Sequence, residues 1–409
     1  MLTRRVVVTG MAGISSLGSD WPAIQKRLRE QRNAVQLMEA WRCYEGLHCH
    51  LGAPVTDFSL PSHYSRKHTR SMGRVAQMAV RASEMALEDA GLLGDPVISS
   101  GQTGVAYGSS VGSTPAIADF GYMLLHHKIG ALNANTYLKM MGHTTAVNVA
   151  IFFQIKGRVI PAVSACTSGS QAIGYAYEAI KYGHQEVMIA GGAEELCPTE
   201  VAVFDTLYAA SVRNDHPQTT PRPFDADRDG LVLGEGGCSL ILEERQRALA
   251  RGATIYAEVV GFGTNSDGAH VTQPSSETMQ VAMTMALADA GMTPEEIGYI
   301  SAHGTATAQG DIAESQATFN VYGSKVPISS LKSYTGHTLG ACGALEAWVA
   351  IEMMRSGEFH PNLNLKNPDP ECAPLDYIAG GMRRIECEAV ASHNFAFGGI
   401  NTALIFKRC

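Results

Sequence analysis

The chain has 409 residues, which is enough for two domains or for one large duplicated domain. Its 45% hydrophobic and 17% charged residues are typical of a well-packed globular protein, and a net charge of −8 excludes a general attraction to nucleic acid or to an anionic membrane. The nine cysteines form no CxxC pair and cannot all be bridged, so we expect a reducing compartment, the cytoplasm.

The apolar run at residues 6–8 follows two arginines and imitates the start of a signal peptide. Because the run is short and breaks at Gly10, we expect a first buried strand there instead. No apolar run in the chain reaches the roughly 18 residues of a membrane span. One early cluster resembles a set of metal ligands: Cys43, His48, Cys49 and His50. No second half of a zinc site follows at a suitable spacing, so we expect no metal site.

The two halves of the chain repeat the same order of elements. In each half a segment with helical periodicity ends in Asp-Ala-Gly, an apolar segment follows, and a fifteen-residue helix bounded by glycines comes later. The expected elements cover 78–91, 103–107 and 169–183 in the first half and 281–291, 297–302 and 343–357 in the second. Short strands between helices are buried on both faces, so the pattern predicts a duplicated, layered α/β/α architecture.

The boundary between the halves is expected after the strand-like and charged segment 238–247, so that 1–251 and 252–409 form the two halves. The first half carries an insertion at 112–154, whose end at 140–154 has the pattern of a buried helix. This insertion could cap a pocket or form a subunit interface. No Pro-rich linker divides the chain, so we expect one rigid body.

Cys166 lies in a small-residue turn between the apolar run 158–163 and the helix that starts at Gly169. Unpaired N–H groups and the positive end of the helix dipole favour a thiolate there, which predicts a pKa below the usual value of about 8.5. Small neighbours leave room for a substrate carbonyl. A buried cysteine that packs as a small hydrophobe is the alternative, and position alone does not decide between the two.

Three stretches of the second half carry further reactive side chains. His303 follows an apolar strand, Lys332 and His337 precede the helix at Gly343, and an aromatic and glycine loop covers 393–399. In open α/β sheets ligands bind at the carboxyl ends of strands. A thiolate with two imidazoles suits acyl transfer to sulfur followed by a step that builds negative charge on a carbonyl oxygen. A cysteine hydrolase would need only one histidine and an orienting Asn or Asp.

Nearly the whole chain resembles the β-ketoacyl-acyl carrier protein synthases of the thiolase superfamily, in the type I/II branch. The motifs that carry the resemblance are RRVVVTGMAGISSLG at the start, VSACTSGSQAIGYAYEAI around Cys166, RPFDADRDGLVLGEGG at 222–237, HGTATAQGD from His303, LKSYTGHTLGACGALE around Lys332 and NFAFGGIN from Asn394. The resemblance implies a duplicated thiolase-like five-layer α/β/α/β/α fold and, usually, a dimer.

The resemblance also implies roles for five residues. Cys166 takes the acyl chain from acyl carrier protein as a thioester. His303 and His337 hold the malonyl thioester carbonyl, so that loss of CO₂ yields an enolate that attacks the acyl group. Lys332 orders the site near the histidines. The backbone N–H groups of Cys166 and Phe397 form an oxyanion hole.

Further positions follow from the same resemblance. Five residues are expected to meet the substrate and its phosphopantetheine arm: Thr305, Thr307, Phe395, Phe397 and Gly398. Val111 and Phe204 are expected to line the acyl pocket, and core packing is the alternative for both. Lys67 and Arg70 are expected to dock an acidic carrier, and a solvated charged face is the alternative. No separate cofactor is implied, because the substrates arrive on the phosphopantetheine of acyl carrier protein.

The chain departs from the family pattern at three places. The usual GFGGTN reads AFGGIN at 396–401, and the stretch often seen as STKSMTGH reads SSLKSYTGH around Lys332. Tyr208 stands where relatives often carry a docking arginine. The acyl chain preference and the carrier therefore stay open, as does the choice between a homodimer and a heterodimer. A ketosynthase of a specialised type II polyketide or aryl polyene pathway, with a chain-length-factor-like partner, is the alternative to fatty acid elongation. A non-condensing partner subunit typically lacks the active cysteine, which is present here.

Overall fold

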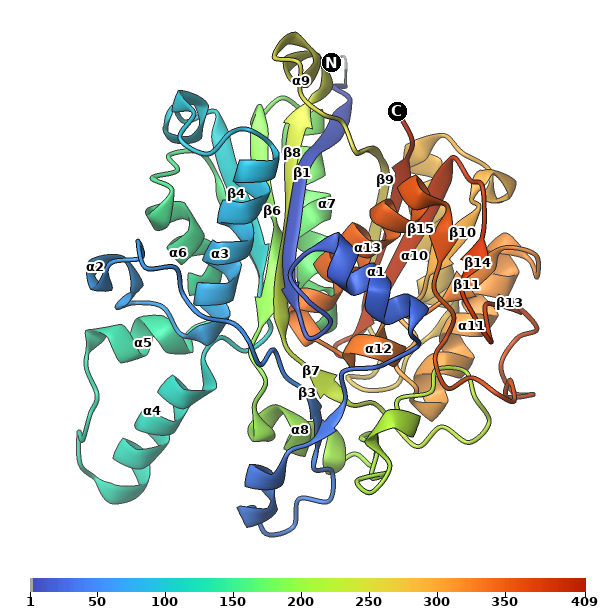
Figure 1. Ribbon diagram of the computed structural model, residues 1–409, viewed down its shortest axis with the longest axis horizontal. Helices are drawn as coiled ribbons and strands as arrows, with labels where there is room; N and C mark the ends of the chain where they lie inside the picture. The colour runs from blue at the N-terminus through green and yellow to red at the C-terminus, as the bar shows by residue number, and fades with distance from the viewer. Residues whose placement is uncertain (1–2) are drawn as a thin grey trace.

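A computed structural model describes residues 3–409 and contains one large sheet with helices on both faces (Figure 1). The strands lie in the order β13-β11-β10-β15-β16-β9-β1-β8-β6-β4-β5. Their bounds are β13 Asp376–Tyr377, β11 Pro327–Ser329, β10 Tyr299–Ser301, β15 Ala389–Ala396, β16 Ile400–Lys407, β9 Ala257–Ser266, β1 Val6–Ser15, β8 Gly236–Glu244, β6 Val187–Glu194, β4 Thr103–Gly108 and β5 Val159–Ala162.

The sheet consists of two copies of one pattern. In the first copy, β1-β8-β6-β4-β5, strand β8 pairs antiparallel with β1 and β6, and β6, β4 and β5 pair in parallel. In the second copy, β9-β16-β15-β10-β11, strand β16 pairs antiparallel with β9 and β15, and β15, β10 and β11 pair in parallel. Within residues 3–409, the two copies pair where residues 6–8 of β1 meet residues 257–259 of β9 and nowhere else. The predicted duplication is therefore confirmed by the strand order.

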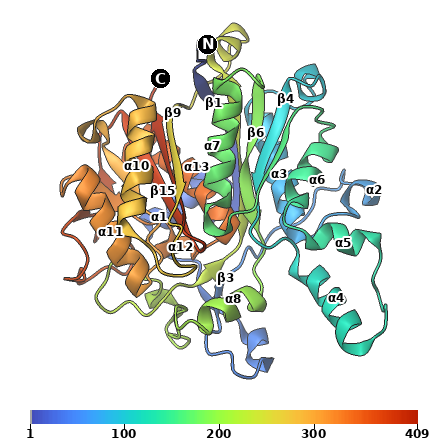
Figure 2. The same cartoon turned by 180° about the vertical axis from the view of Figure 1, so that it is seen from behind.

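Helices form three further layers around the two copies. Two long helices, α7 (Ser168–Lys181) and α13 (Cys342–Ser356), lie between them and contact each other (Figures 1 and 2). The outer faces are covered by α3 (Arg74–Asp89) and α6 (Thr144–Phe152) on one side and by α10 (Ser276–Ala290) and α11 (Ala308–Tyr322) on the other. This is the expected five-layer α/β/α/β/α fold.

The remaining elements are short or peripheral. The helices are α1 Trp21–Arg29, α2 Arg66–Thr69, α4 Thr114–His126, α5 Ala134–Met140, α8 Pro198–Asp205, α9 Arg245–Ala250 and α12 Lys332–Thr335. The strands are β2 Gln36–Leu37, β3 Leu51–Ala53, β7 Leu233–Gly234, β12 Glu358–Phe359 and β14 Arg383–Arg384. Within residues 3–409, no helix is both long and apolar enough to cross a membrane.

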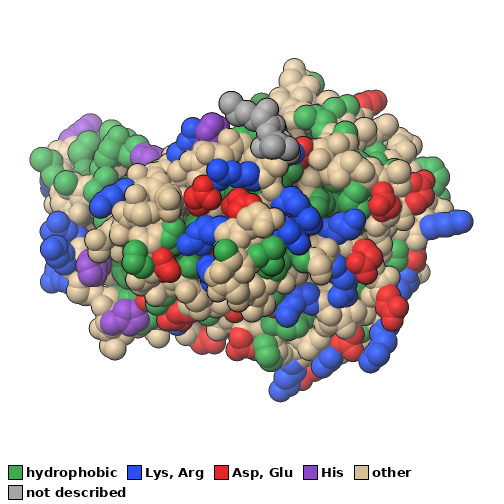
Figure 3. Space-filling model, turned by 90° about the horizontal axis from the view of Figure 1, so that it is seen from above, with side chains coloured by type: hydrophobic (Ala, Val, Ile, Leu, Met, Phe, Trp, Pro, Cys, Tyr) green, Lys and Arg blue, Asp and Glu red, His purple; other side chains and the backbone are tan. Residues whose placement is uncertain are grey.

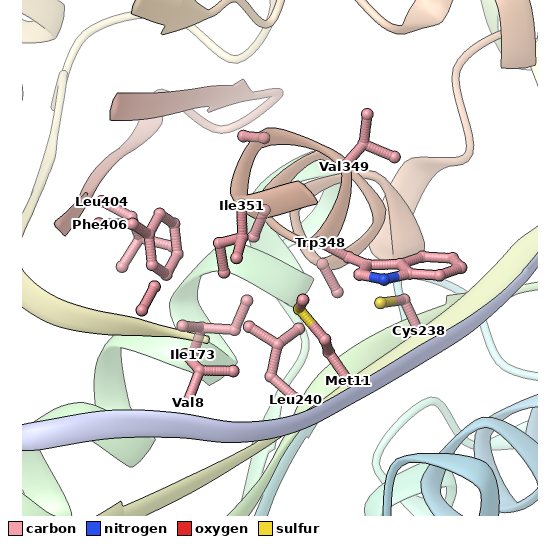
Figure 4. Packing of buried hydrophobic residues seen from close by; sticks show 14 of the residues in the cluster. Val8, Met11, Ile173, Cys238, Leu240, Trp348, Val349, Ile351, Leu404 and Phe406 are labelled. Carbon is pink, nitrogen blue, oxygen red and sulfur yellow. The ribbon is translucent and has the colours of Figure 1, made fainter. Parts of the chain in front are cut away.

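The largest hydrophobic core lies where α7 and α13 pack between the two copies. Ile173 of α7 and Trp348 and Ile351 of α13 meet Leu240 of β8 and Leu404 of β16 (Figure 4). These side chains are at most 3% exposed. Each buried side chain of this size stabilises the fold by about 1.5–3 kcal/mol, so the central helices join the halves into one body.

The insertion of the first half stands away from the body. Helices α4 and α5 form a projecting arm beside α6 (Figures 1 and 2). The arm exposes large apolar side chains, each more than half exposed: Leu124, Leu125, Ile129 and Tyr137. The adjacent strand β5 ends the sheet and has a free edge. A free edge next to exposed apolar side chains is typical of a subunit interface.

Candidate active site

Cys166 occupies a turn of 3-10 helix, Ala165–Thr167, directly before α7. Hydrogen bonds close the turn: the N–H of Ser164 donates to the hydroxyl of Ser168 (2.9 Å), which donates to the carbonyl of Ala165 (2.6 Å). Ala165 adopts a left-handed conformation with φ of 49°. The small residues of this turn therefore let the chain bend sharply and present the thiol at the start of the helix.

The second half brings two histidines to this thiol. His303 follows β10 and His337 follows α12, and Nε2 of His337 lies 2.9 Å from Sγ of Cys166. The two imidazole rings are 5.2 Å apart between centroids and nearly perpendicular. All three side chains line one cavity of about 440 Å³. The structure thus brings to Cys166 two histidines that lie 137 and 171 positions further along the chain.

The hydrogen bonds of the histidines assign their tautomers. Nδ1 of His303 lies 3.1 Å from the ammonium Nζ of Lys332, and Nδ1 of His337 accepts the N–H of Leu339 (3.3 Å). Both Nδ1 atoms are therefore acceptors, which leaves the ring proton on Nε2. Burial and the Lys332 ammonium hold the pKa of both imidazoles well below the ordinary value. Each histidine is a neutral Nε2–H donor at the site.

The acidity of Cys166 differs from the prediction. The side chain is 5% exposed, and burial raises the pKa of the thiol to about 12. The Lys332 ammonium and the N–H groups of Phe397 and of Cys166 itself lower the pKa, but by less than burial raises it. The predicted low pKa is wrong because desolvation of the sulfur anion outweighs the helix start. Two N–H groups nevertheless lie beside the sulfur, which is where the oxygen of a bound acyl group needs donors.

Most of the expected substrate residues line the same cavity. The hydroxyls of Thr305 and Thr307 lie 2.9 Å apart, and Phe395 and Phe397 are on the wall. Gly398 does not line the cavity. Its N–H donates to the carbonyl of Val271 (2.8 Å) and so ties the glycine loop to the segment before α10.

The two residues expected at the acyl pocket differ in position. Phe204 of α8 lines the cavity, and its ring lies 5.1 Å from that of Phe397 between centroids. Val111 does not line it, because the chain at that point turns toward Glu194, whose carboxylate accepts the N–H groups of Ser110 and Val111. The structure therefore places one of the pair, Phe204, beside Cys166.

A buried carboxylate, Glu346, and a buried amide, Asn394, contact the residues that hold the histidines in place. Glu346 pairs with Lys332, and its second oxygen accepts the Nδ2–H of Asn394 (2.7 Å). Glu314 of α11 accepts the N–H groups of His303 and Gly304 (2.7 and 2.6 Å) and so holds their turn. Glu314 and Asn394 were not among the residues predicted for the site. Glu314 lies on the buried face of the partly exposed helix α11, and Asn394 lies in the buried part of β15, so each is a polar residue on a buried face.

Two groups of side chains have the spacing of metal ligands in the part of the chain that the structure describes. Donor atoms of Cys166, His303 and His337 lie within 4.8 Å of one another, and so do those of His303, Cys342 and Glu346. The Lys332 ammonium already contacts His303 and Glu346, so a cation in the second group would face a fixed positive charge. The cluster Cys43, His48, Cys49 and His50 forms no such group.

The expected docking residues lie elsewhere. Lys67 and Arg70 are exposed on and beside α2, at the edge of the molecule that is on the left in Figure 1. The view from above shows Lys and Arg side chains gathered at that edge (Figure 3). Neither Lys67 nor Arg70 lines the cavity that holds Cys166.

Both halves of the chain match known families and proteins. Residues 3–248 match the family model "Beta-ketoacyl synthase, N-terminal domain" and residues 256–366 match "Beta-ketoacyl synthase, C-terminal domain". The 3-oxoacyl-[acyl-carrier-protein] synthase 2 of Vibrio cholerae is 38% identical, with 100% of each chain covered.

Solved structures are similar over the same length. A beta-ketoacyl synthase from Burkholderia phymatum STM815 is 60% identical and has a TM-score of 0.98, covering 99% of this chain and 100% of that one. The ishigamide ketosynthase/chain length factor is 32% identical with a TM-score of 0.91, and both chains are covered fully. The matched segments include Cys166, His303 and His337.

Proposed function

The chain belongs to the beta-ketoacyl synthase family, and from this we propose that it extends an acyl chain by two carbons in a decarboxylative Claisen condensation. The acyl group is held as a thioester on Cys166, and malonyl-acyl carrier protein supplies the two carbons. The observation that carries the proposal is the thiol 2.9 Å from one of two neutral imidazoles that line the same cavity.

The first step moves the acyl group onto the enzyme. Sγ of Cys166 attacks the carbonyl of the carrier-bound thioester, and the negative oxygen forms beside the N–H groups of Cys166 and Phe397. The carbon–sulfur bond to phosphopantetheine then breaks, and the departing thiolate takes up the proton that Cys166 loses. Because the free enzyme holds a neutral thiol, this proton transfer belongs to the reaction.

The second step forms the new bond. The Nε2–H groups of His303 and His337 donate to the thioester carbonyl oxygen of the malonyl group, so that the electrons released with CO₂ collect as an enolate. The enolate carbon attacks the acyl carbonyl on Cys166, the carbon–sulfur bond to Cys166 breaks, and the released thiolate takes a proton from solvent. Lys332 keeps the proton of His303 on Nε2 and acts as a positioning residue.

The remaining assignments belong to the same proposal. Thr305 and Thr307 meet the phosphopantetheine arm, with Phe395, Phe397 and Gly398 forming the wall and the loop next to it. No separate cofactor takes part, because the thiol, the imidazoles and the N–H groups supply the nucleophile and the enolate stabilisation. The halves 1–251 and 252–409 contribute the nucleophile and the histidines respectively. Nine free cysteines support a reducing compartment, the cytoplasm.

Two partners follow from this function. One is acyl carrier protein, which the name of the Vibrio cholerae relative contains. The other is a second ketosynthase-like subunit across the free edge of β5 and the exposed side chains of the α4–α5 arm. A homodimer and a pair with a chain-length-factor-like subunit both fit this surface, and native mass measurement of the purified protein decides between them.

Replacing the nucleophile separates the two chemical steps. In Cys166→Gln no acyl thioester can form, so condensation is expected to fall at least 10³-fold, while decarboxylation of malonyl-acyl carrier protein continues on the two histidines. Cys43→Gln changes an exposed cysteine in the same way and should leave both activities unchanged. Condensation that survives in Cys166→Gln overturns the assignment. Loss of both activities in a folded protein overturns the role of the histidines.

A second pathway is supported by the similarity to the ishigamide ketosynthase/chain length factor. In that case the enzyme extends a polyketide or aryl polyene chain instead of a saturated fatty acyl chain. Assays of the purified protein with saturated and with aryl or polyene primers separate the two pathways, because only the primer differs. Equal rates with both classes would contradict a specialised role.

A further inference from the structure

Asn394 is a fully buried amide that contacts both an acid and a histidine of the site. It lies on β15 and pairs there with Thr402 of β16, so the sheet holds its backbone. Its Nδ2 atom lies 2.7 Å from an oxygen of Glu346 and 3.4 Å from Nδ1 of His303. The same two groups contact the ammonium of Lys332. The amide and the ammonium therefore share one pair of acceptors.

These acceptors fix the orientation of the amide. If the amide were turned over, Oδ1 of Asn394 would face the Glu346 carboxylate and Nδ1 of His303, which both accept hydrogen bonds. In the orientation found, Oδ1 is buried and has no hydrogen-bond donor within residues 3–409. An unpaired buried acceptor costs free energy and needs an explanation in a native fold. The two contacts of Nδ2 supply that explanation.

The amide also restricts where His303 can carry its ring proton. Nζ of Lys332 is 3.1 Å from Nδ1 and Nδ2 of Asn394 is 3.4 Å from it, so N–H groups face Nδ1 from two side chains. Lys332 is the nearer and the charged donor. A proton on Nδ1 would point at the N–H groups of the amide, so the neutral ring keeps its proton on Nε2.

We propose that Asn394 is a positioning residue that excludes the proton from Nδ1 of His303 and holds the Glu346 carboxylate in place for Lys332. The inference rests on the proposed function, in which Nε2–H of His303 donates to the enolate oxygen. Lys332 carries its ammonium on a flexible four-carbon stem. The amide is short and lies on a strand, so it limits how far the ring and the carboxylate can turn. Asn394 does not line the cavity, and it acts through His303 and Glu346.

Exchanging the amide and the acid separates this role from simple packing. The variant Asn394→Asp/Glu346→Gln keeps the size of both side chains and their total charge, so a carboxylate and an amide still pair with each other and with Lys332. An aspartate oxygen then faces Nδ1 of His303 in place of Nδ2. Nδ1 gains an acceptor and takes up the ring proton, which leaves Nε2 without one.

The exchange should stop one chemical step and spare the other. We expect decarboxylation of malonyl-acyl carrier protein to fall about 10²-fold or more, because a histidine held in the wrong tautomer lowers kcat about 10⁴-fold in a serine protease. Acyl transfer to Cys166 should stay within about threefold of wild type, because Nε2 of His303 takes no part in it. Asn320→Asp makes the same change at an exposed position of α11 and is the matched control.

Nitrogen-15 NMR of histidine-labelled protein measures the tautomer without any assay of activity. The signal of His303 is the one that disappears in His303→Gln. We expect a proton on Nε2 in the wild type and in Asn320→Asp, and on Nδ1 in the exchange variant. A proton on Nδ1 in the wild type overturns the proposal. So does an exchange variant that keeps the Nε2 proton and decarboxylates at the wild-type rate, because Asn394 then only packs.

A second variant keeps the proposal falsifiable if the exchange variant does not fold. Asn394→Ala removes the amide without adding a charge, and decarboxylation should fall about tenfold with little change of KM for malonyl-acyl carrier protein. A wild-type rate in Asn394→Ala overturns the proposal. If the wild type carries its proton on Nε2 but neither decarboxylates nor condenses, the proposed function fails and the catalytic role of Asn394 fails with it, whereas the tautomer assignment stands.

Discussion

The ammonium of Lys332 lies 3.1 Å from Nδ1 of His303 and is paired with the carboxylate of Glu346, and all three side chains are buried. One cation therefore fixes the tautomer of the histidine and balances a buried charge. These two roles can be separated by substitution.

In Lys332→Met the Nδ1 atom loses its donor and Glu346 is left without a counter-charge. We expect decarboxylation to fall about 10²- to 10³-fold and the free energy of unfolding to fall by about 3–5 kcal/mol. The double variant Lys332→Met/Glu346→Gln removes both charges and should recover most of the stability but not the activity. Urea unfolding and a malonyl-carrier decarboxylation assay measure the two effects. Recovery of activity in the double variant would contradict the positioning role.

Alkylation of Cys166 should depend steeply on pH. Since burial raises the pKa of the thiol to about 12, its reaction with iodoacetamide is expected to rise about tenfold for each pH unit between 7 and 10. The rate for a cysteine in a free peptide levels off above about pH 8.5 and serves as the control. Mass spectrometry of the peptide that contains Cys166 measures the rate. A plateau near pH 7 would restore the low pKa that the sequence predicted.

The contrast at Cys166 shows what a sequence can and cannot predict. The turn between a strand and a helix is a local pattern, so the position of Cys166 and the helix from Gly169 could be predicted to within one or two residues. The pKa of its thiol depends on burial by side chains from the other half of the chain, and the sequence around Cys166 does not show that burial. The helix dipole lowers the pKa of the thiol and can be read from the local sequence, whereas burial raises it by more and cannot.

The same distinction holds for the rest of the site. His303, Lys332 and His337 lie in turns next to predicted elements, so their positions followed from the repeat and the motifs. The interaction of Asn394 with Glu346 joins β15 to α13 and depends on how closely the sheet and the helix pack. Val111 misses the cavity because Glu194 draws its backbone away, a long-range contact that the motif does not contain.

His393 should make the fold sensitive to acid. Its ring is fully buried and stacked on Tyr322, and burial lowers its pKa to about 3. The unfolded chain binds a proton below about pH 6.5 while the folded protein does not, so stability is lost as pH falls from 6.5 toward 3. At pH 5 the loss from this residue is about 2 kcal/mol.

The variant His393→Phe keeps an aromatic ring on Tyr322 and removes the titration. Between pH 7.5 and 5.0 its free energy of unfolding should therefore fall by about 2 kcal/mol less than that of the wild type, as measured by urea unfolding at each pH. His184→Phe changes an exposed ring and should follow the wild type. Parallel curves for His393→Phe and wild type would contradict the buried neutral state.

The crossing of α7 and α13 should tolerate no side chain at Gly343. A Cβ atom built there would lie 2.6 Å from the backbone nitrogen of Ser170 and 2.8 Å from Oδ1 of Asn394, so the helix start must move away from the Cys166 turn. In Gly343→Ala we expect a loss of about 1–3 kcal/mol in the free energy of unfolding. Condensation should fall at least tenfold, because a shift of about 1 Å between reacting groups can cost 10²-fold.

Gly121→Ala is the matched control for that substitution, because a Cβ atom at this position in α4 meets nothing within 4 Å. It should raise the free energy of unfolding by up to about 1 kcal/mol, since alanine is the better helix residue, and leave condensation unchanged. Thermal unfolding and the condensation assay compare the two variants directly. Equal stability and activity of Gly343→Ala and Gly121→Ala would show that the starts of α7 and α13 can separate without moving Cys166 from His337. In that case the close crossing of the two helices would not be what holds the thiol against the imidazole.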